Sequence, residues 1–142
     1  MKYLILTLSL LLAAPAQASV YLDTHGISKH LNTDMPFNEK NNGVGISWDS
    51  GERGMWSFGR YQNSMDKKSH YINYTTNFIN EKNYRIGVIT GLVTGYPMPV
   101  APVVAPLISF GDTHRVNIGA LPQIKGITPA VIFMNFQWRI HQ

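Results

Sequence analysis

The feature that most constrains this chain is an alternation of polar and apolar residues with a period of two, interrupted by turn residues at short, regular intervals. Helical periodicity is almost absent, so the pattern indicates one all-β domain. It predicts eight strands, and these are Val20–Leu31, Gly43–Asp49, Met55–Gln62, Ser69–Ile79, Tyr84–Tyr96, Ala101–Phe110, His114–Leu121 and Thr128–Ile140.

The predicted connections alternate in length. They are long after the first, third and fifth strands and short after the second, fourth and sixth. Barrels of the bacterial outer membrane show this asymmetry, with short turns on the periplasmic side and longer loops outside. Most predicted strands are also close to the ~9–11 residues that a tilted strand needs to cross a bilayer.

The two faces of the predicted strands differ most clearly in the last one. Its even positions from Met134 to Ile140 are apolar, and its odd positions from Asn135 to Arg139 are polar. A lipid-facing barrel requires polar residues inside and apolar residues outside. A water-soluble barrel would reverse the faces, and Tyr84–Tyr96 and Ala101–Phe110 are apolar on nearly both. The favoured prediction is an eight-stranded antiparallel transmembrane β-barrel with up-and-down connections.

The first 18 residues have the three zones of a secretory signal peptide. Lys2 is the positive start, Tyr3–Ala14 is an apolar run, and Ala16-Gln17-Ala18 is a small-residue cleavage site. The run is shorter than the roughly 20 residues of a membrane-spanning helix. Residues 1–18 are therefore predicted to be removed, residues 19–142 to form the barrel, and the protein to reach the outer membrane through the periplasm.

Composition adds three expectations. The chain has no cysteine, so a small exported domain lacks its usual disulfides, and a closed barrel in lipid is an alternative source of stability. Without Lys2, 11 basic residues stand against 8 acidic ones, a charge of +3 that suits anionic lipid heads or ordinary solubility. No basic run exceeds two residues, so nucleic acid is not expected. His25 and His30 are an odd number of residues apart, which on an unbroken strand places them on opposite faces, so a metal bound by this pair is not expected. No cofactor is expected either.

Several ordered features resemble the PagP-type lipid A palmitoyltransferases over roughly the whole chain after the signal peptide. That family consists of eight-stranded outer-membrane barrels that move a palmitoyl chain from a phospholipid to lipid A. The features are His25 ahead of Gly43-Val44-Gly45-Ile46 with Asn38-Glu39 between, Tyr61-Gln62-Asn63-Ser64, the glycine-rich Ile86–Gly91, the proline-bearing Ala101–Leu107, Leu121-Pro122, and the aromatic-alternating Phe133–Ile140.

The resemblance implies a monomeric acyltransferase that acts on phospholipid and lipid A in the outer membrane. His25 would be the base and Ser64 the hydroxyl, both on the long-loop side. Asn63 departs from the family, which has Asp there. An asparagine cannot supply negative charge to an imidazolium, but it can accept or donate a hydrogen bond. Asp23 and Asp66 are nearby candidates for the carboxylate, although neither matches by position.

Four further residues would contact the lipid. Pro106 and Pro122 cannot donate to a strand ladder, so they would mark broken pairing, which in the resembled family admits lipid from the side. The alternative is that Pro106 lies at a bulge without function. Tyr61 matches an aromatic position, and Thr75 replaces a glycine on the lumen floor, which should shorten the acyl chain accepted. The family's early prolines are missing, with Val20 and Asn42 in about those places.

Two other functions compete with the acyltransferase. A non-enzymatic outer-membrane barrel could alter surface recognition through its loops, and Asn63 favours this reading. A soluble periplasmic barrel of the lipocalin type could bind a ligand. The set formed by His25, Ser64 and the prolines favours the enzyme.

Overall fold

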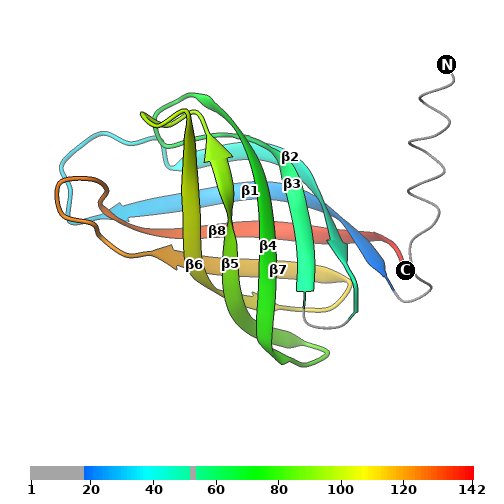
Figure 1. Cartoon of the computed structure of the whole chain (residues 1–142). Helices are drawn as coiled ribbons and strands as arrows, with labels where there is room; N and C mark the ends of the chain where they lie inside the picture. Colours follow the sequence, from blue (N-terminus) through cyan, green and yellow to red (C-terminus); the bar gives the residue numbers. More distant parts are fainter. Residues whose placement is uncertain (1–17, 52–53) are drawn as a thin grey trace, which may run out of the picture.

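The computed structural model describes residues 18–51 and 54–142, and the predicted signal peptide lies almost wholly outside them. The described residues form eight strands in a closed barrel in which each strand pairs antiparallel with the next and the last with the first (Figure 1). The strands are β1 (Ser19–Leu31), β2 (Lys40–Asp49), β3 (Gly54–Gln62), β4 (Lys68–Asn80), β5 (Tyr84–Thr94), β6 (Val100–Phe110), β7 (His114–Leu121) and β8 (Ala130–His141). The predicted all-β, up-and-down barrel is confirmed.

The two ends of the barrel differ as the connection lengths predict. The short turns after β2, β4 and β6 lie at one end, together with the start of β1 and the end of β8 (Figure 1). The longer loops after β1, β3, β5 and β7 gather at the other end. We call the half of the lumen beside the turns the turn half and the half beside the loops the loop half. Within the described residues, no helix is long and apolar enough to cross a membrane.

A bulge in β1 corrects one step of the sequence reasoning. The pairing of β1 with both β2 and β8 shifts between His25 and Ile27. Before the bulge the odd positions Tyr21 and Asp23 are buried, whereas after it the even position Ser28 is buried. The odd spacing of His25 and His30 therefore does not determine which faces they lie on, because the strand between them is not regular.

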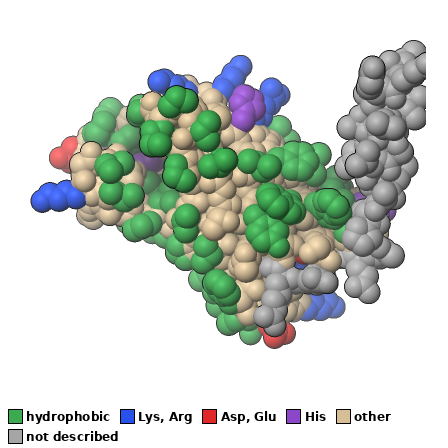
Figure 2. All heavy atoms as spheres, viewed as in Figure 1, with side chains coloured by type: hydrophobic (Ala, Val, Ile, Leu, Met, Phe, Trp, Pro, Cys, Tyr) green, Lys and Arg blue, Asp and Glu red, His purple; other side chains and the backbone are tan. Residues whose placement is uncertain are grey.

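Side chains alternate between a polar lumen and an apolar exterior. The buried polar or charged side chains include Asp23, Ser47, Asp49, Ser57, Thr75, Arg115, Asn117 and Gln137. The exposed large apolar side chains include Trp48, Trp56, Phe58, Ile72, Phe78, Leu92, Val104 and Phe110. Apolar groups cover much of the face seen in Figure 2, while lysines and arginines lie mostly at its edges. This is the polar-in, apolar-out arrangement predicted from the last strand.

The ladder between β6 and β7 is the shortest in the barrel. β6 pairs with β5 along its whole length, from Val100 to Phe110, but it pairs with β7 only from Leu107 onward. Pro102 and Pro106 lie in the stretch without β7 pairing, and neither carries an amide hydrogen. The predicted interruption at Pro106 is thus present. Pro122 lies just after the end of β7 and interrupts no strand.

Candidate functional site

The unpaired stretch of β6 forms a lateral gap on the loop half of the barrel. Pairing with β7 ends at Leu107 and Gly119, although β7 itself continues to Leu121 along β8. The stretch of β6 that borders the gap is apolar or proline throughout, from Val100 to Pro106. Its alternate positions are exposed on the outer face, and Ala105 is fully buried in the lumen. A hydrocarbon chain approaching the lumen here would pass between apolar side chains, along a stretch in which Pro102 and Pro106 carry no amide hydrogen.

Asn63 organises the loop between β3 and β4. Its side chain has no exposed surface. Its Oδ1 accepts hydrogen bonds from the backbone amides of Met65 (2.8 Å) and Lys67 (3.0 Å). Its Nδ2 donates to Ser69 Oγ (3.0 Å) and to the carbonyl of Gly95 (2.8 Å), which ties this loop to the one after β5. An aspartate could not donate to the Gly95 carbonyl, so the departure from the resembled family fits this local structure.

Ser64 lies beside this anchor and is half-buried. Its carbonyl accepts a hydrogen bond from the amide of Asn38 (2.9 Å), and Asn38 Nδ2 donates to the carbonyl of Asn63 (3.1 Å). The loop after β1 is thereby joined to the loop after β3. No described residue forms a hydrogen bond with Ser64 Oγ. The site residue predicted as a nucleophile is held in place through its backbone.

The backbone of His25 pairs with Gly43 on β2 and Asn135 on β8, and its side chain lies outside the described part of the structure. Gly43 in turn pairs with Tyr61, two residues before the anchored loop. The backbone of His25 therefore lies in the ladder row that contains Tyr61, two strands along the wall and two residues before this loop. Proton transfer between His25 and Ser64 stays a prediction.

Tyrosine side chains occupy the loop half of the lumen. The hydroxyl of Tyr61 lies 3.2 Å from that of Tyr96, and its ring centroid is 6.1 Å from that of Tyr71. Tyr71 reaches across the lumen and donates to Asp23 Oδ2 (3.4 Å). A Cβ added at Gly45 would lie 2.1 Å from the Tyr71 hydroxyl, so the ring needs the bare backbone there. An acyl chain entering this half would have to displace these rings.

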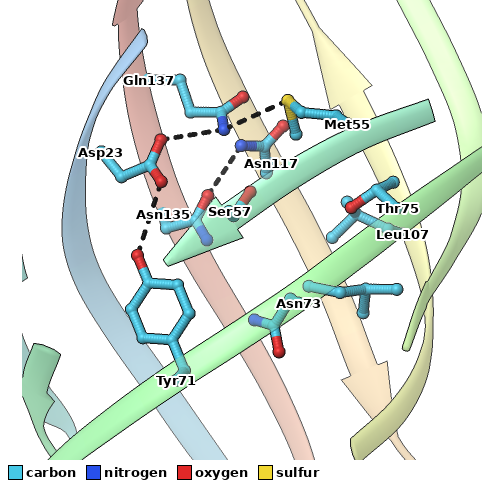
Figure 3. Close-up of a pocket in the computed structure, with 11 residues that line it drawn as sticks. Asp23, Met55, Ser57, Tyr71, Asn73, Thr75, Leu107, Asn117, Asn135 and Gln137 are labelled. Carbon is cyan, nitrogen blue, oxygen red and sulfur yellow. Dashed lines mark hydrogen bonds between the residues drawn. The ribbon is translucent and has the colours of Figure 1, made fainter. Parts of the chain in front are cut away.

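On the turn side of the tyrosines, a cluster of hydrogen-bonded side chains surrounds Asp23 (Figure 3). Ser47 Oγ donates to Asp23 Oδ2 (2.6 Å), and Gln137 Nε2 donates to Asp23 Oδ1 (2.9 Å). The hydroxyls of Ser47 and Ser57 are 2.6 Å apart. The carboxylate is thus satisfied by neutral donors from three other strands, which is the condition for burying it.

A small cavity of about 30 Å³ lies beside this cluster. Thr75 lines it together with Asn73, Asn117 and Gln137, and each of these four residues has a buried polar atom without a partner among the described residues. The volume suits one or two water molecules and not an acyl chain. Thr75 therefore lies on the lumen wall, at the point where the loop half meets the turn half.

Charged residues close the turn half, and sequence reasoning did not single them out. Arg115 Nη2 lies 2.9 Å from Asp49 Oδ2, and its guanidinium carbon lies 3.9 Å from the centroid of the Tyr21 ring. Arg85 approaches the same carboxylate at 3.8 Å, and Arg139 pairs with Asp112. The available signal was that each arginine falls on an inward position of its predicted strand.

A scan against protein-family models found no match, and a search of curated proteins found none either. The resemblance to the lipid A palmitoyltransferases therefore stays a prediction from the ordered features of the sequence.

Proposed function

We propose that this protein is a β-barrel of the bacterial outer membrane and that it transfers an acyl chain from a phospholipid to lipid A. The membrane location is supported by the outward faces of neighbouring strands. Trp48, Trp56 and Tyr74 form one cross-strand row, and Ile46, Phe58 and Ile72 form the next. Water-soluble monomers rarely expose contiguous apolar surfaces of this kind, whereas a lipid-facing barrel requires them.

The observation that carries the acyl-transfer proposal is the short ladder between β6 and β7. In an otherwise closed barrel it leaves an apolar, proline-bearing gap, and this gap lies on the same half of the lumen as Tyr61. A lipid in the surrounding leaflet could insert its acyl chain through such a gap while its polar head stays at the rim. The loop after β3 at this end carries Ser64, and the backbone of His25 lies in the middle of β1, in the ladder row of Gly43 and Tyr61.

The proposed chemistry proceeds in two ester exchanges. Ser64 Oγ attacks the carbonyl carbon of a phospholipid ester, an acyl-serine bond forms, and the bond to the glycerol oxygen breaks. The serine proton passes to His25 and then to the glycerol oxygen, so lysophospholipid leaves. A hydroxyl of lipid A then attacks the acyl-serine, its proton returns to Ser64 through His25, and acylated lipid A is released.

Mass spectrometry of lipid A from cells with and without the gene tests this function. The expected result is one added acyl mass with the wild-type gene and none with Ser64→Ala. Added mass that persists with Ser64→Ala would leave the activity standing and overturn the role of Ser64. Membrane location is checked separately by heat-modifiable gel migration of protein extracted from the outer membrane, whose absence would exclude a membrane barrel.

The gap can be tested on its own because the chain has no cysteine of its own. If the β6–β7 register continued, Pro106 would lie opposite Ala120 on the outward face, where Ile108 and Ile118 already pair. A short bis-maleimide linker between Pro106→Cys and Ala120→Cys should abolish the lipid A acylation that the unlinked double variant retains. The same linker between Ile108→Cys and Ile118→Cys is the control and should leave it intact. Equal activity in both linked proteins would show that lipid does not enter here.

A second function, a non-enzymatic barrel that alters surface recognition through its loops, is favoured by two observations. All the hydrogen-bonding groups of the Asn63 side chain are used within the loops, and the cavity beside Thr75 is too small for an acyl chain. An unchanged lipid A mass in cells that carry the folded barrel would decide for this function.

A further inference from the structure

The outward face of β2, β3 and β4 changes from apolar to basic between two neighbouring cross-strand rows near the loops. The row of Ile46, Phe58 and Ile72 is apolar. The next row toward the loops contains Arg60 paired with His70, and the one after it contains Lys68 paired with Gln62. Arg60, Lys68 and His70 are all exposed and lie on the same face as the apolar row.

Two further lysines flank this point. Lys40 is exposed on the outward face of β2, and Lys67 is exposed in the loop between β3 and β4. We call Lys40, Arg60, Lys67 and Lys68 the basic rim. In Figure 2, lysine or arginine side chains and a histidine gather on the upper edge of the molecule, above the apolar surface. Among the described residues, none of the four makes an ion pair, whereas nearby Lys29 is paired with Glu39 (3.0 Å).

We infer that the basic rim binds the phosphate groups of a glycolipid in the leaflet that surrounds the loop end of the barrel. This inference rests on the proposed membrane location and names the part of lipid A that the barrel recognises. Arg60 and Lys68 are diagonal neighbours on adjacent strands, so their backbones are about 7–8 Å apart, within reach of one headgroup. The guanidinium of Arg60 can grip a phosphate with two parallel hydrogen bonds.

The basic rim borders the apolar outer surface, and this position favours a lipid as its partner. A headgroup phosphate lies just beyond the hydrocarbon of its own acyl chains, as Arg60 and Lys68 lie just beyond Phe58 and Ile72. Acyl chains would then cover the apolar row while the phosphates meet the basic rim. A soluble acidic protein approaching the loops from above would meet Asp34, Glu39 and Asp66 as well, which lie in the loops on that side.

The test compares lipids on the folded full-length barrel in zwitterionic micelles. Native mass spectrometry measures the binding of lipid A with two phosphates, the same lipid A after phosphate removal, and inorganic phosphate alone. The wild-type protein should prefer the phosphorylated lipid. Arg60→Gln with Lys68→Gln should weaken that binding by about fivefold for each charge removed and leave the dephosphorylated lipid unaffected.

The matched control removes two lysines elsewhere. Lys82 lies at the turn end and Lys125 in the loop after β7, and both are exposed. Lys82→Gln with Lys125→Gln changes the net charge equally and should bind as the wild type does. A similar loss in the control pair, or a loss that is equal for both lipids, overturns the inference. So does inorganic phosphate binding as tightly as the lipid, because the rim would then be a free-phosphate site.

The result of this lipid-binding test does not depend on acyl transfer. Binding is measured without an acyl donor and can be repeated with Ser64→Ala, which should bind as the wild type does. A protein that acylates lipid A but ignores its phosphates would refute only the basic rim. A protein that fails to insert, shown by unchanged gel migration on heating, would refute the proposed function itself.

Discussion

The two halves of the lumen are built on different principles. The turn half is held by buried charge and short hydrogen bonds, with Arg115 on Asp49 and Ser47 on Asp23. The loop half is lined by glycines and tyrosines, and its wall is incomplete between β6 and β7. Removing one partner of a buried ion pair is costly, whereas the wall of the loop half lacks part of one ladder. We therefore expect the turn half to contribute more to the stability of the barrel than the loop half.

The largest effect is expected from Arg115→Met in the turn half. The change leaves Asp49 with the Gly51 amide at 3.1 Å and the longer contact to Arg85 at 3.8 Å, so a buried carboxylate loses its main charged partner. The free energy of unfolding should fall by about 3–5 kcal/mol. Urea unfolding in lipid vesicles, followed by tryptophan fluorescence, measures it. A loss of less than 1 kcal/mol would contradict the larger contribution of the turn half.

A smaller loss is expected from Gly45→Ala in the loop half. The new Cβ would lie 2.1 Å from the Tyr71 hydroxyl and 2.7 Å from the Phe58 carbonyl, so the ring must leave its place. Overpacking of this kind costs about 1–3 kcal/mol. The same unfolding experiment checks it, with Tyr71→Ala added as a second change. The loss of unfolding free energy in the double variant should be smaller than the sum of the two single losses. Strictly additive losses would contradict a clash with Tyr71.

Asn63→Asp probes the rim, where the loops meet. The aspartate keeps the acceptor for the Met65 and Lys67 amides but loses the donor to the Gly95 carbonyl. Unfolding should be easier by about 1–3 kcal/mol, the cost of leaving a buried carbonyl unpaired. Urea unfolding in lipid vesicles measures this loss. An unchanged stability together with raised lipid A acylation would instead favour a catalytic carboxylate at this position.

The smallest effect concerns the exposed pair of Lys29 and Glu39. The hydrogen bond from Lys29 lowers the pKa of Glu39 below its ordinary value. A lowered pKa stabilises the fold above the unfolded-state value of about 4.3 and loses that contribution as the pH falls through the folded-state pKa. Because the pair is exposed, Glu39→Gln should leave stability at pH 7 unchanged within error and flatten its slope only at acid pH. A clear loss at pH 7 would show that this loop also anchors the barrel.

The proposed roles of His25, Ser64, Tyr61 and Pro122 came from sequence order alone and stay predictions. For Asn63 the sequence identified the position, and the structure supplied the hydrogen bond to the Gly95 carbonyl, 32 positions away, which no local pattern reveals. The partner of Arg115 was hidden for the same reason, since Asp49 is 66 positions away. A local pattern can say which way a side chain points, but not what it will meet across the lumen.

The sequence by itself determined the strand count, the connection order and the polar lumen, because alternation with a period of two is a property of each segment alone. Only the tertiary structure decided the bulge at Gly26, the short ladder at Pro106 and the charge pairs of the turn half. These depend on the register between strands, which is set by the closure of β8 onto β1. The register of each strand depends on its contacts with both neighbouring strands, so it cannot be read from a single stretch of the chain.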